Sequence, residues 1–176
     1  MSVAADLLAR IRDVPDWPKP GIVFKDITPL LADHATFAAA VEALTAPHRG
    51  AGLDTVAGIE ARGFVLGAPV ALALGAGFVP VRKKGKLPGS TVEASYDLEY
   101  GSATLEVTSD AFMEGAKVLV VDDVLATGGT AAATVDLVRR CGGVVVGVSV
   151  LMELGFLDGR TALRAVGIET HALLTV

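Results

Sequence analysis

Residues 118–130 constrain the fold of this chain more than any other stretch, because they join a strand pattern, an acidic pair and a tight turn. The stretch opens with four consecutive apolar residues, which are typical of a parallel strand buried on both faces. Asp122 and Asp123 follow at the end of that strand, and small residues over 126–130 then lead into a helix. Strand, loop and helix in this order predict one unit of an open α/β sheet, in which ligands bind at the carboxyl ends of the strands.

The loop over 126–130 has the chemistry of an anion site. Its residues are Ala126, Thr127, Gly128, Gly129 and Thr130. Side chains this small let backbone N–H groups approach an anion closely, and the following helix N-terminus adds roughly half a positive charge. The two threonine hydroxyls are further donors. We therefore expect a phosphate monoester at this loop, with Asp122 and Asp123 accepting hydrogen bonds from a pair of vicinal hydroxyls.

Each half of this motif has an ordinary explanation when it stands alone. A Gly-Gly turn after a strand is common, and an acidic residue at a strand end can simply cap the next helix. The combination of apolar strand, acidic pair and small-residue loop is much more specific. It differs from the Walker loop, because no Gly-Lys-Ser/Thr follows, and it does not match the Gly-x-Gly-x-x-Gly dinucleotide pattern.

The overall charge excludes some classes of partner. The sequence carries 20 acidic and 15 basic residues, which gives a net charge of −5. A chain with this balance has no general attraction for nucleic acid or anionic lipid, so we expect no nucleic-acid partner. An anionic ligand must then be bound by backbone N–H groups and a local basic cluster. Such a cluster occurs over 82–86, although a short charged run is by itself more typical of a solvated loop.

Length and composition favour one cytoplasmic α/β domain over 1–176. With 176 residues, 52% of them apolar, the chain can bury a sizeable core. Its single cysteine, Cys141, excludes an intrachain disulfide. Residues 63–81 carry no charge, but glycines and prolines interrupt them. We therefore expect a buried helix followed by a buried strand there, and no contact with a membrane.

The hydrophobic pattern predicts the other elements of this domain. Helices are expected over 4–11, 35–46 (capped by Asp33), 63–74 and 130–141, and strands over 55–59, 77–81, 117–121, 144–152 and 171–176. An extended, proline-rich connector is expected over 14–21. Residues 82–95 lack periodicity and predict a mobile loop, followed by a hairpin between 96–99 and 102–108.

Several motifs in the same order resemble the type I phosphoribosyltransferases, and the similarity runs along nearly the whole chain. The motifs lie at 20–30 (PGIVFKDITPL), 60–64 (EARGF), 82–89 (RKKGKLPG), 96–101 (YDLEYG), 118–130 and 152–154 (MEL). The resemblance implies a central, mostly parallel sheet flanked by helices. It also implies a small N-terminal hood over about 1–30 and a flexible hairpin loop over about 82–101.

The resemblance further implies an activity, the transfer of the 5-phosphoribosyl group from phosphoribosyl pyrophosphate to N9 of adenine. The products would be AMP and pyrophosphate, as in purine salvage, and the enzyme would be a homodimer. The family uses Mg²⁺, which is held mainly by the substrate, so no set of protein metal ligands is expected. Pyrophosphate gains negative charge as it leaves an oxocarbenium-like sugar, so fixed cations near it lower the barrier.

Roles for the basic residues follow from the same resemblance. Arg62 is the pyrophosphate residue and a catalytic candidate. Ala61 is a substrate-binding candidate, and the peptide bond between Ala61 and Arg62 is expected to be cis. Arg82, Lys83 and Lys86 are further candidates for binding pyrophosphate, and one of them is expected to reach across a dimer interface.

Glu99 is the family's acid/base candidate, assisted by its neighbour Tyr100. Local sequence alone would make Glu99 an exposed carboxylate on a hairpin. The resemblance instead makes it part of a loop that closes over the substrate. Two roles stay open for Glu99: contact with the proton of adenine, and ordering of the closed loop.

The base is expected, by resemblance, to be read through backbone groups of Val23 and Lys25, with Phe24 stacked on the ring and Leu154 lining the pocket. One backbone N–H and one C=O suffice for the acceptor at N1 and the donor at N6 of adenine. Residue chemistry alone therefore leaves a 6-oxopurine such as guanine, hypoxanthine or xanthine as an alternative base. A non-catalytic sensor of phosphoribosyl pyrophosphate is the other alternative, but such proteins usually append a DNA-binding domain, for which this chain has no extra length.

Overall fold

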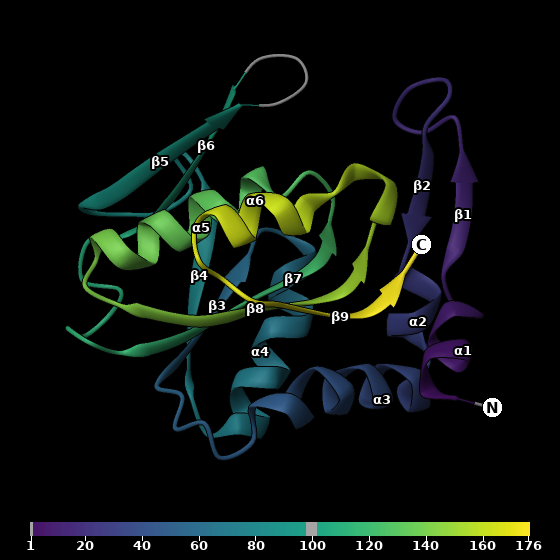
Figure 1. Ribbon diagram of the computed structural model, residues 1–176, viewed down its shortest axis with the longest axis horizontal. Helices are drawn as coiled ribbons and strands as arrows, with labels where there is room; N and C mark the ends of the chain where they lie inside the picture. Colours follow the sequence, from purple (N-terminus) through teal and green to yellow (C-terminus); the bar gives the residue numbers. More distant parts are fainter. Residues whose placement is uncertain (1, 98–101) are drawn as a thin grey trace. The chain divides into compact units, whose positions relative to one another are not determined.

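The computed structural model describes residues 2–97 and 102–176 of the chain (Figure 1). The chain divides into two compact units, Met1–Ala43 and Leu44–Val176. The smaller unit contains two short helices, a two-stranded antiparallel sheet and most of a third helix. These elements are α1 (Val3–Leu8), β1 (Arg12–Pro15), β2 (Val23–Asp26), α2 (Thr28–Ala32) and α3 (His34–Thr45).

The proline-rich segment is a hairpin turn and not the extended connector that the sequence predicted. β1 already ends at Pro15, and the chain then reverses toward β2. Asp16 has a φ of +58°, and its Oδ1 accepts the N–H of Gly21, at 2.7 Å. An aspartate that bonds its own turn in this way favours chain reversal over extension, which is the physical reason for the difference. Trp17 packs edge-on against Phe24, with ring centroids 4.4 Å apart.

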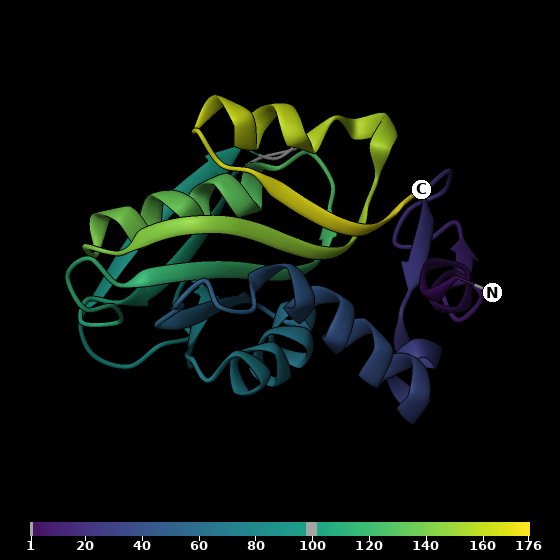
Figure 2. The ribbon, with the colours of Figure 1, turned by 60° about the horizontal axis from the view of Figure 1, so that its bottom comes forward.

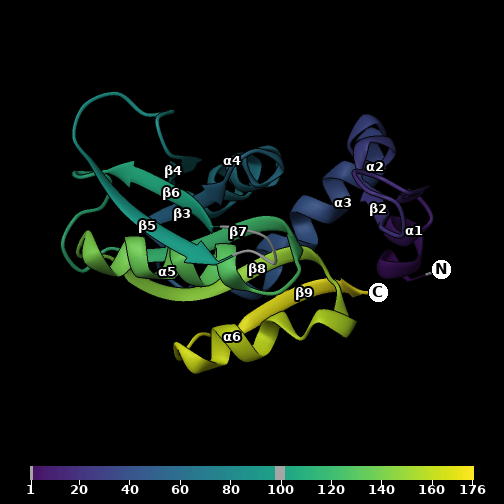
Figure 3. The same cartoon turned by 90° about the horizontal axis from the view of Figure 1, so that it is seen from above.

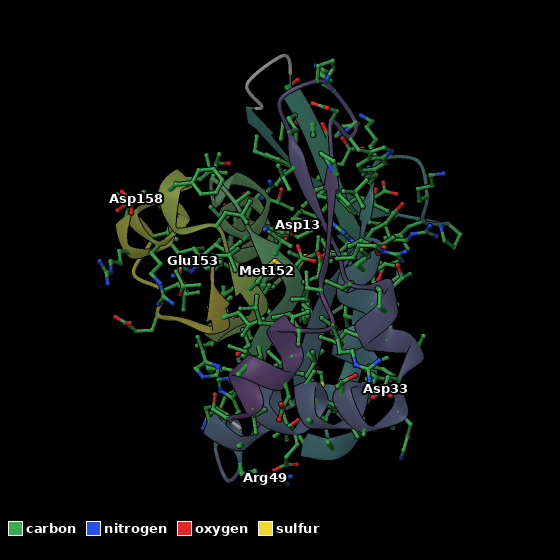
Figure 4. The ribbon with its side chains drawn as sticks, turned by 90° about the vertical axis from the view of Figure 1, so that its right-hand side faces the viewer. Asp13, Asp33, Arg49, Met152, Glu153 and Asp158 are labelled. Atoms are coloured by element: carbon green, nitrogen blue, oxygen red, sulfur yellow. The ribbon has the colours of Figure 1, made fainter. Side chains whose placement is uncertain are left out.

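Asp33 caps α3, as the sequence predicted. Its Oδ1 accepts the backbone N–H of Thr36, at 2.9 Å, and this hydrogen bond holds the pKa of Asp33 below its usual value. Figure 4 labels Asp33 near the start of this helix. The cap fixes the beginning of α3 one residue earlier than the hydrophobic pattern indicated.

The larger unit is built on a seven-stranded sheet with the order β5-β6-β4-β3-β7-β8-β9. The strands are β3 (Thr55–Ile59), β4 (Gly77–Lys83), β5 (Thr91–Asp97), β6 (Ser102–Thr108), β7 (Lys117–Leu125), β8 (Val144–Glu153) and β9 (Thr170–Thr175). β3, β4, β7, β8 and β9 are parallel, whereas β5 and β6 form an antiparallel hairpin at the edge next to β4. This is the mostly parallel sheet that was predicted.

Helices cover both faces of this sheet (Figure 2). α4 (Arg62–Leu74) lies on one face, and α5 (Gly129–Arg140) and α6 (Gly159–Ala165) lie side by side on the other (Figure 3). α6 has no counterpart in the sequence prediction. Residues 63–81 form α4 and β4, as expected, and no helix among the described residues is long and apolar enough to span a membrane.

Two sequence predictions near the site are wrong. β7 does not stop before the acidic pair, because Asp122 and Val124 continue the ladder with Val150 and Met152 of β8. The irregular loop is also shorter than 82–95. Arg82 and Lys83 pair with β6, and β5 begins at Thr91, so main-chain pairing outweighs the unfavourable local pattern at both ends.

Candidate active site

The loop over 126–130, which is predicted to bind a phosphate and is called the phosphate loop below, lies where β7 ends and α5 begins. β7 ends at Leu125, and α5 starts at Gly129. Gly128 makes the turn with a φ of +86°, a left-handed conformation that favours glycine. The loop lines a small cavity of about 70 Å³, together with the last residues of β7. Backbone N–H groups at the start of a twelve-residue helix and the Thr127 and Thr130 hydroxyls are thus gathered at one end of the sheet.

Asp122 and Asp123 stand side by side immediately before this loop. Asp122 Oδ1 accepts the N–H of Asp123, at 2.8 Å. Burial and the neighbouring Asp123 carboxylate raise the pKa of Asp122 well above its usual value. Asp123 is only 5% exposed. A buried carboxylate of this kind requires a partner, and the start of α4 supplies it.

That partner is Arg62, the first residue of α4. Its Nε lies 2.8 Å from Asp123 Oδ2, an ion pair that lacks the angles of a hydrogen bond. Arg62 can approach β7 this closely because Gly63 follows it. A Cβ on Gly63 would lie 2.9 Å from both Asp122 Oδ1 and the carbonyl oxygen of Val121. The residues expected to bind pyrophosphate and ribose are therefore in direct contact.

The cis peptide bond that does not involve proline is one residue earlier than predicted. It joins Glu60 to Ala61, whereas a cis bond was expected between Ala61 and Arg62. The latter bond enters the first turn of α4, where the helical backbone requires the trans form.

Two acidic residues hold the basic segment over 82–87, which includes the end of β4. Glu60 accepts the backbone N–H of Lys83, at 3.0 Å, and Nε of Arg82, at 3.1 Å. Glu106 is 3% exposed and accepts the backbone N–H groups of Lys86 and Leu87, each at 2.8 Å. Burial alone would raise the pKa of Glu106, but these backbone N–H groups outweigh it, so the pKa lies below its usual value.

One open pocket of about 410 Å³ brings together seven of the predicted site residues. The predicted residues that line it are Ala61, Arg62, Lys83, Asp122, Asp123, Ala126 and Thr130. Glu60 and Tyr96 also line this pocket, although the sequence gave them no role. Glu60 belongs to the motif at 60–64 and Tyr96 to the motif at 96–101. Their place in these motifs was the signal that could have identified them as site residues. Arg82 is turned toward Glu60 and the carbonyl oxygen of Lys86.

The residues expected to read the base lie in separate parts of the structure. Leu154 follows β8, and its N–H donates to the carbonyl of Leu125, at 2.9 Å. Val23, Phe24 and Lys25 belong to β2 in the smaller unit, where Lys25 Nζ pairs with Asp13, at 2.7 Å. Since this sheet has two strands, one edge of β2 carries backbone groups that no described strand pairs. The acid/base candidates Glu99 and Tyr100 lie outside the described residues.

Known proteins resemble this chain in sequence and in fold. The family model described as phosphoribosyl transferase domain matches residues 30–163. Together with the phosphate loop and the acidic pair, the match defines the class of protein as a phosphoribosyltransferase. Adenine phosphoribosyltransferase of a Nocardioides species is 64% identical to this chain over 98% of its length and 94% of the relative's length. The enzyme of Thermobifida fusca is 61% identical, over 94% and 93%.

Solved structures agree with the sequence comparison. The crystal structure of adenine phosphoribosyltransferase from Rhodothermus marinus has a TM-score of 0.94 at 51% identity and covers 99% of this chain and 98% of that one. The Saccharomyces cerevisiae enzyme, solved with adenine and an imino-altritol bisphosphate, has a TM-score of 0.92 at 39% identity and 98% coverage of both chains. The chain belongs to the adenine phosphoribosyltransferase family. The fold class and the family predicted from the sequence are confirmed.

Proposed function

We propose that this protein transfers the 5-phosphoribosyl group from phosphoribosyl pyrophosphate to N9 of adenine, producing AMP and pyrophosphate. The observation that carries the proposal is the single pocket shared by Arg62, the acidic pair and the phosphate loop, in a chain 64% identical to an adenine phosphoribosyltransferase. The yeast relative binds adenine, and the Giardia lamblia relative, 38% identical, binds 9-deazaadenine. Both ligands carry the 6-amino group of adenine.

The phosphate loop binds the 5-phosphate in this proposal. Backbone N–H groups over 126–130 and the hydroxyls of Thr127 and Thr130 donate to its oxygens. The small size of Ala126, Gly128 and Gly129 is what lets the backbone come close. Asp122 and Asp123 accept hydrogen bonds from the ribose hydroxyls, which places the anomeric carbon in the open pocket.

Cations next to the acidic pair bind the pyrophosphate. Arg62 and Lys83 line the same pocket and can face its oxygens, with the backbone of Ala61 beside them. Arg82 and Lys86 are further candidates, held in the segment that Glu60 and Glu106 anchor. Their charges stabilise the leaving group as negative charge builds up on it.

Adenine is read by the edge of β2 and by Leu154. The ion pair with Asp13 occupies the side chain of Lys25, so its backbone is the part left to contact a base. Phe24 supplies a face for stacking. Glu99, assisted by Tyr100, is proposed to act as acid/base or to order the closed loop.

Mg²⁺ is the proposed cofactor, and the chemistry of the pocket fits an ion that arrives with the substrate. Among residues 2–97 and 102–176, no three His, Cys, Asp or Glu side chains are grouped to hold a metal. Asp122 and Asp123 do face a pocket of about 410 Å³, with room for an ion that keeps waters and substrate oxygens. When bound, the ion neutralises charge on the pyrophosphate.

We further propose that the enzyme is a cytoplasmic homodimer. Val65 and Leu72 on α4 are 42% and 83% exposed, and a partner subunit would cover such apolar side chains. One of Arg82, Lys83 and Lys86 would then reach the partner's pocket. Sedimentation of the purified protein tests the dimer.

Single-substrate assays test the activity. Pyrophosphate release is measured with phosphoribosyl pyrophosphate, Mg²⁺ and one purine at a time. We expect release with adenine and almost none with guanine, hypoxanthine or xanthine. Release with a 6-oxopurine instead would favour the alternative base, and no release with any purine would favour the non-catalytic sensor.

A further inference from the structure

The first residues of α6 contact the phosphate loop in a way that leaves no room for side chains. A Cβ on Gly159 would overlap the carbonyl oxygen of Ala126, and it would lie 2.9 Å from Leu125 Cγ and 3.1 Å from the nitrogen of Gly128. A Cβ on Gly128 would lie 2.9 Å from Ala162 Cβ. Real Cβ atoms essentially never come within 3.0 Å of another residue's heavy atoms, so the two segments pack backbone against backbone.

Space, and not backbone conformation, is what requires glycine at position 159. The φ of Gly159 lies outside the left-handed region, so an L-residue could adopt it. Gly128 differs, because its φ of +86° would disfavour another residue even in open space. A substitution of Gly159 therefore tests the close contact between α6 and the phosphate loop without changing the preferred backbone conformation.

α6 is anchored so that it cannot easily retreat from the loop. Arg160 Nε donates to Glu153 Oε2, at 2.6 Å, and Arg160 Nη1 donates to the carbonyl of Thr170, at 2.7 Å. Glu153 is 5% exposed at the end of β8, and Figure 4 shows it beside the yellow α6 segment, with Asp158 at the segment's outer end. Leu163 of α6 is fully buried. An added atom at position 159 must therefore displace the phosphate loop more than it displaces α6.

We propose that Gly159 is a positioning residue for phosphoribosyl transfer, because α6 sets the place of the backbone N–H groups that bind the 5-phosphate. This inference rests on the proposed function of the loop. Hydrogen bonds weaken steeply as their distances and angles depart from the optimum. A small shift at Ala126 and Gly128 therefore lowers the affinity for a 5-phosphate. The same shift leaves in place the basic residues on α4 and β4 that are proposed to bind pyrophosphate.

A glycine that merely permits packing gives a different result. Its replacement would lower the melting temperature, but the folded molecules would keep their affinity for every ligand. The ratio of ribose 5-phosphate affinity to pyrophosphate affinity separates the two roles. Both ligands can be titrated calorimetrically against the same protein sample with Mg²⁺ present.

Gly159→Ala is the first variant, and Gly147→Ala on β8 is its matched control, since a Cβ there would meet nothing closer than 3.6 Å. We expect Gly159→Ala to bind ribose 5-phosphate roughly tenfold more weakly or worse, as the loss of one or two hydrogen bonds to a charged group implies. Its affinity for pyrophosphate should stay within about twofold of wild type on the same scale. Gly147→Ala should match wild type for both ligands.

Ala162→Val is the second variant. It distinguishes a positioning role from a packing role if Gly159→Ala does not fold. It adds methyl groups against Gly128 without touching Gly159, and the same selective loss is expected. Folded variants that bind ribose 5-phosphate like wild type would overturn this inference and leave the proposed function intact. A wild-type protein that made no AMP from adenine and bound no ribose 5-phosphate would overturn both.

Discussion

Arg62 Nε lies 2.8 Å from Asp123 Oδ2, so a cation expected to bind pyrophosphate already neutralises an acid expected to bind ribose. The pair joins the start of α4 to β7 and forms part of the pocket wall. Asp123 is nearly inaccessible, whereas 39% of the Arg62 side chain is exposed and can also face a ligand. A substrate that carries both ribose and pyrophosphate would thus bind to a site in which the cation and the carboxylate already lie side by side.

Asp123→Asn should weaken the binding of phosphoribosyl pyrophosphate by roughly tenfold to a hundredfold while the fold survives. The change removes a charge-assisted acceptor for ribose, worth about 1.5–3 kcal/mol, and it removes the ion partner of Arg62. Titration calorimetry measures the affinity, and circular dichroism confirms the fold. Asp136→Asn on α5 is the control, because Asp136 pairs only at the surface with Arg140. Normal binding by both Asp122→Asn and Asp123→Asn would show that the hydroxyl pair is bound elsewhere.

Phe24→Ala should raise the Michaelis constant for adenine and leave the preference for adenine over hypoxanthine largely intact. The ring supplies stacking surface, whereas the backbone of β2 distinguishes the edge of the base. Steady-state kinetics with each base gives both quantities. Lys25→Met is the control, since only the backbone of Lys25 is assigned to the base. A Phe24→Ala variant that lost its preference but kept its affinity would mean that side chains read the edge.

Glu106→Gln should lower the melting temperature at pH 7 by about 3–10 °C, because the buried carboxylate that accepts two backbone N–H groups loses its charge. The pKa of Glu106 is lowered in the folded protein from its usual value of 4.5. The ionised form therefore stabilises the fold above that value, and the contribution is lost as pH falls through the folded pKa.

Melting curves of wild type and Glu106→Gln between pH 7 and pH 3 check this sign. The difference in melting temperature between wild type and Glu106→Gln should become smaller at low pH. Glu93→Gln, which removes an exposed partner of Lys84, should show a much smaller gap at every pH. A gap for Glu106→Gln that widened on acidification would contradict the direction of the pKa shift.

Glu99→Gln should reduce turnover by roughly 10²–10⁴-fold with little change in substrate affinity, the range expected for the loss of general acid–base help. Closure of the loop should also exclude water from the oxocarbenium-like centre. Hydrogen exchange over 82–99 should therefore slow when a non-reactive analogue of phosphoribosyl pyrophosphate is added. Glu93→Gln, in the same hairpin, is the kinetic control. Unchanged exchange together with near-normal turnover would make Glu99 an ordinary surface carboxylate.

Some parts of this molecule could be predicted because short-range physics decides them. β3 spans the predicted residues, since a short run buried on both sides of a sheet stands out from its surroundings. The small-residue loop over 126–130 was expected between a strand and a helix because an apolar run and an acidic pair precede it, and it does lie between β7 and α5. The start of α3 followed from the cap at Asp33.

Other parts depend on partners that are distant in sequence. Asp122 and Asp123 resemble the end of a strand, yet pairing with β8 carries β7 past them to Leu125. In the sequence, Glu106 looks like any polar residue of a hairpin. Its role becomes visible only in the structure, where it accepts the backbone N–H of Lys86. α6 has seven residues, too few to show a helical period, and the close approach of Gly159 to the phosphate loop leaves no trace in local sequence. The proposed recognition of adenine through backbone groups likewise leaves no trace in local sequence.

A competition experiment tests the central claim most directly. Adenine, guanine, hypoxanthine and xanthine are supplied at equal concentrations with limiting phosphoribosyl pyrophosphate and Mg²⁺, and the nucleotide products are separated by chromatography. The product ratios then equal the ratios of kcat/KM. The account predicts that AMP forms one-to-one with pyrophosphate and makes up nearly all of the nucleotide. Nucleotides of a 6-oxopurine in comparable amounts, or pyrophosphate without AMP, would contradict it.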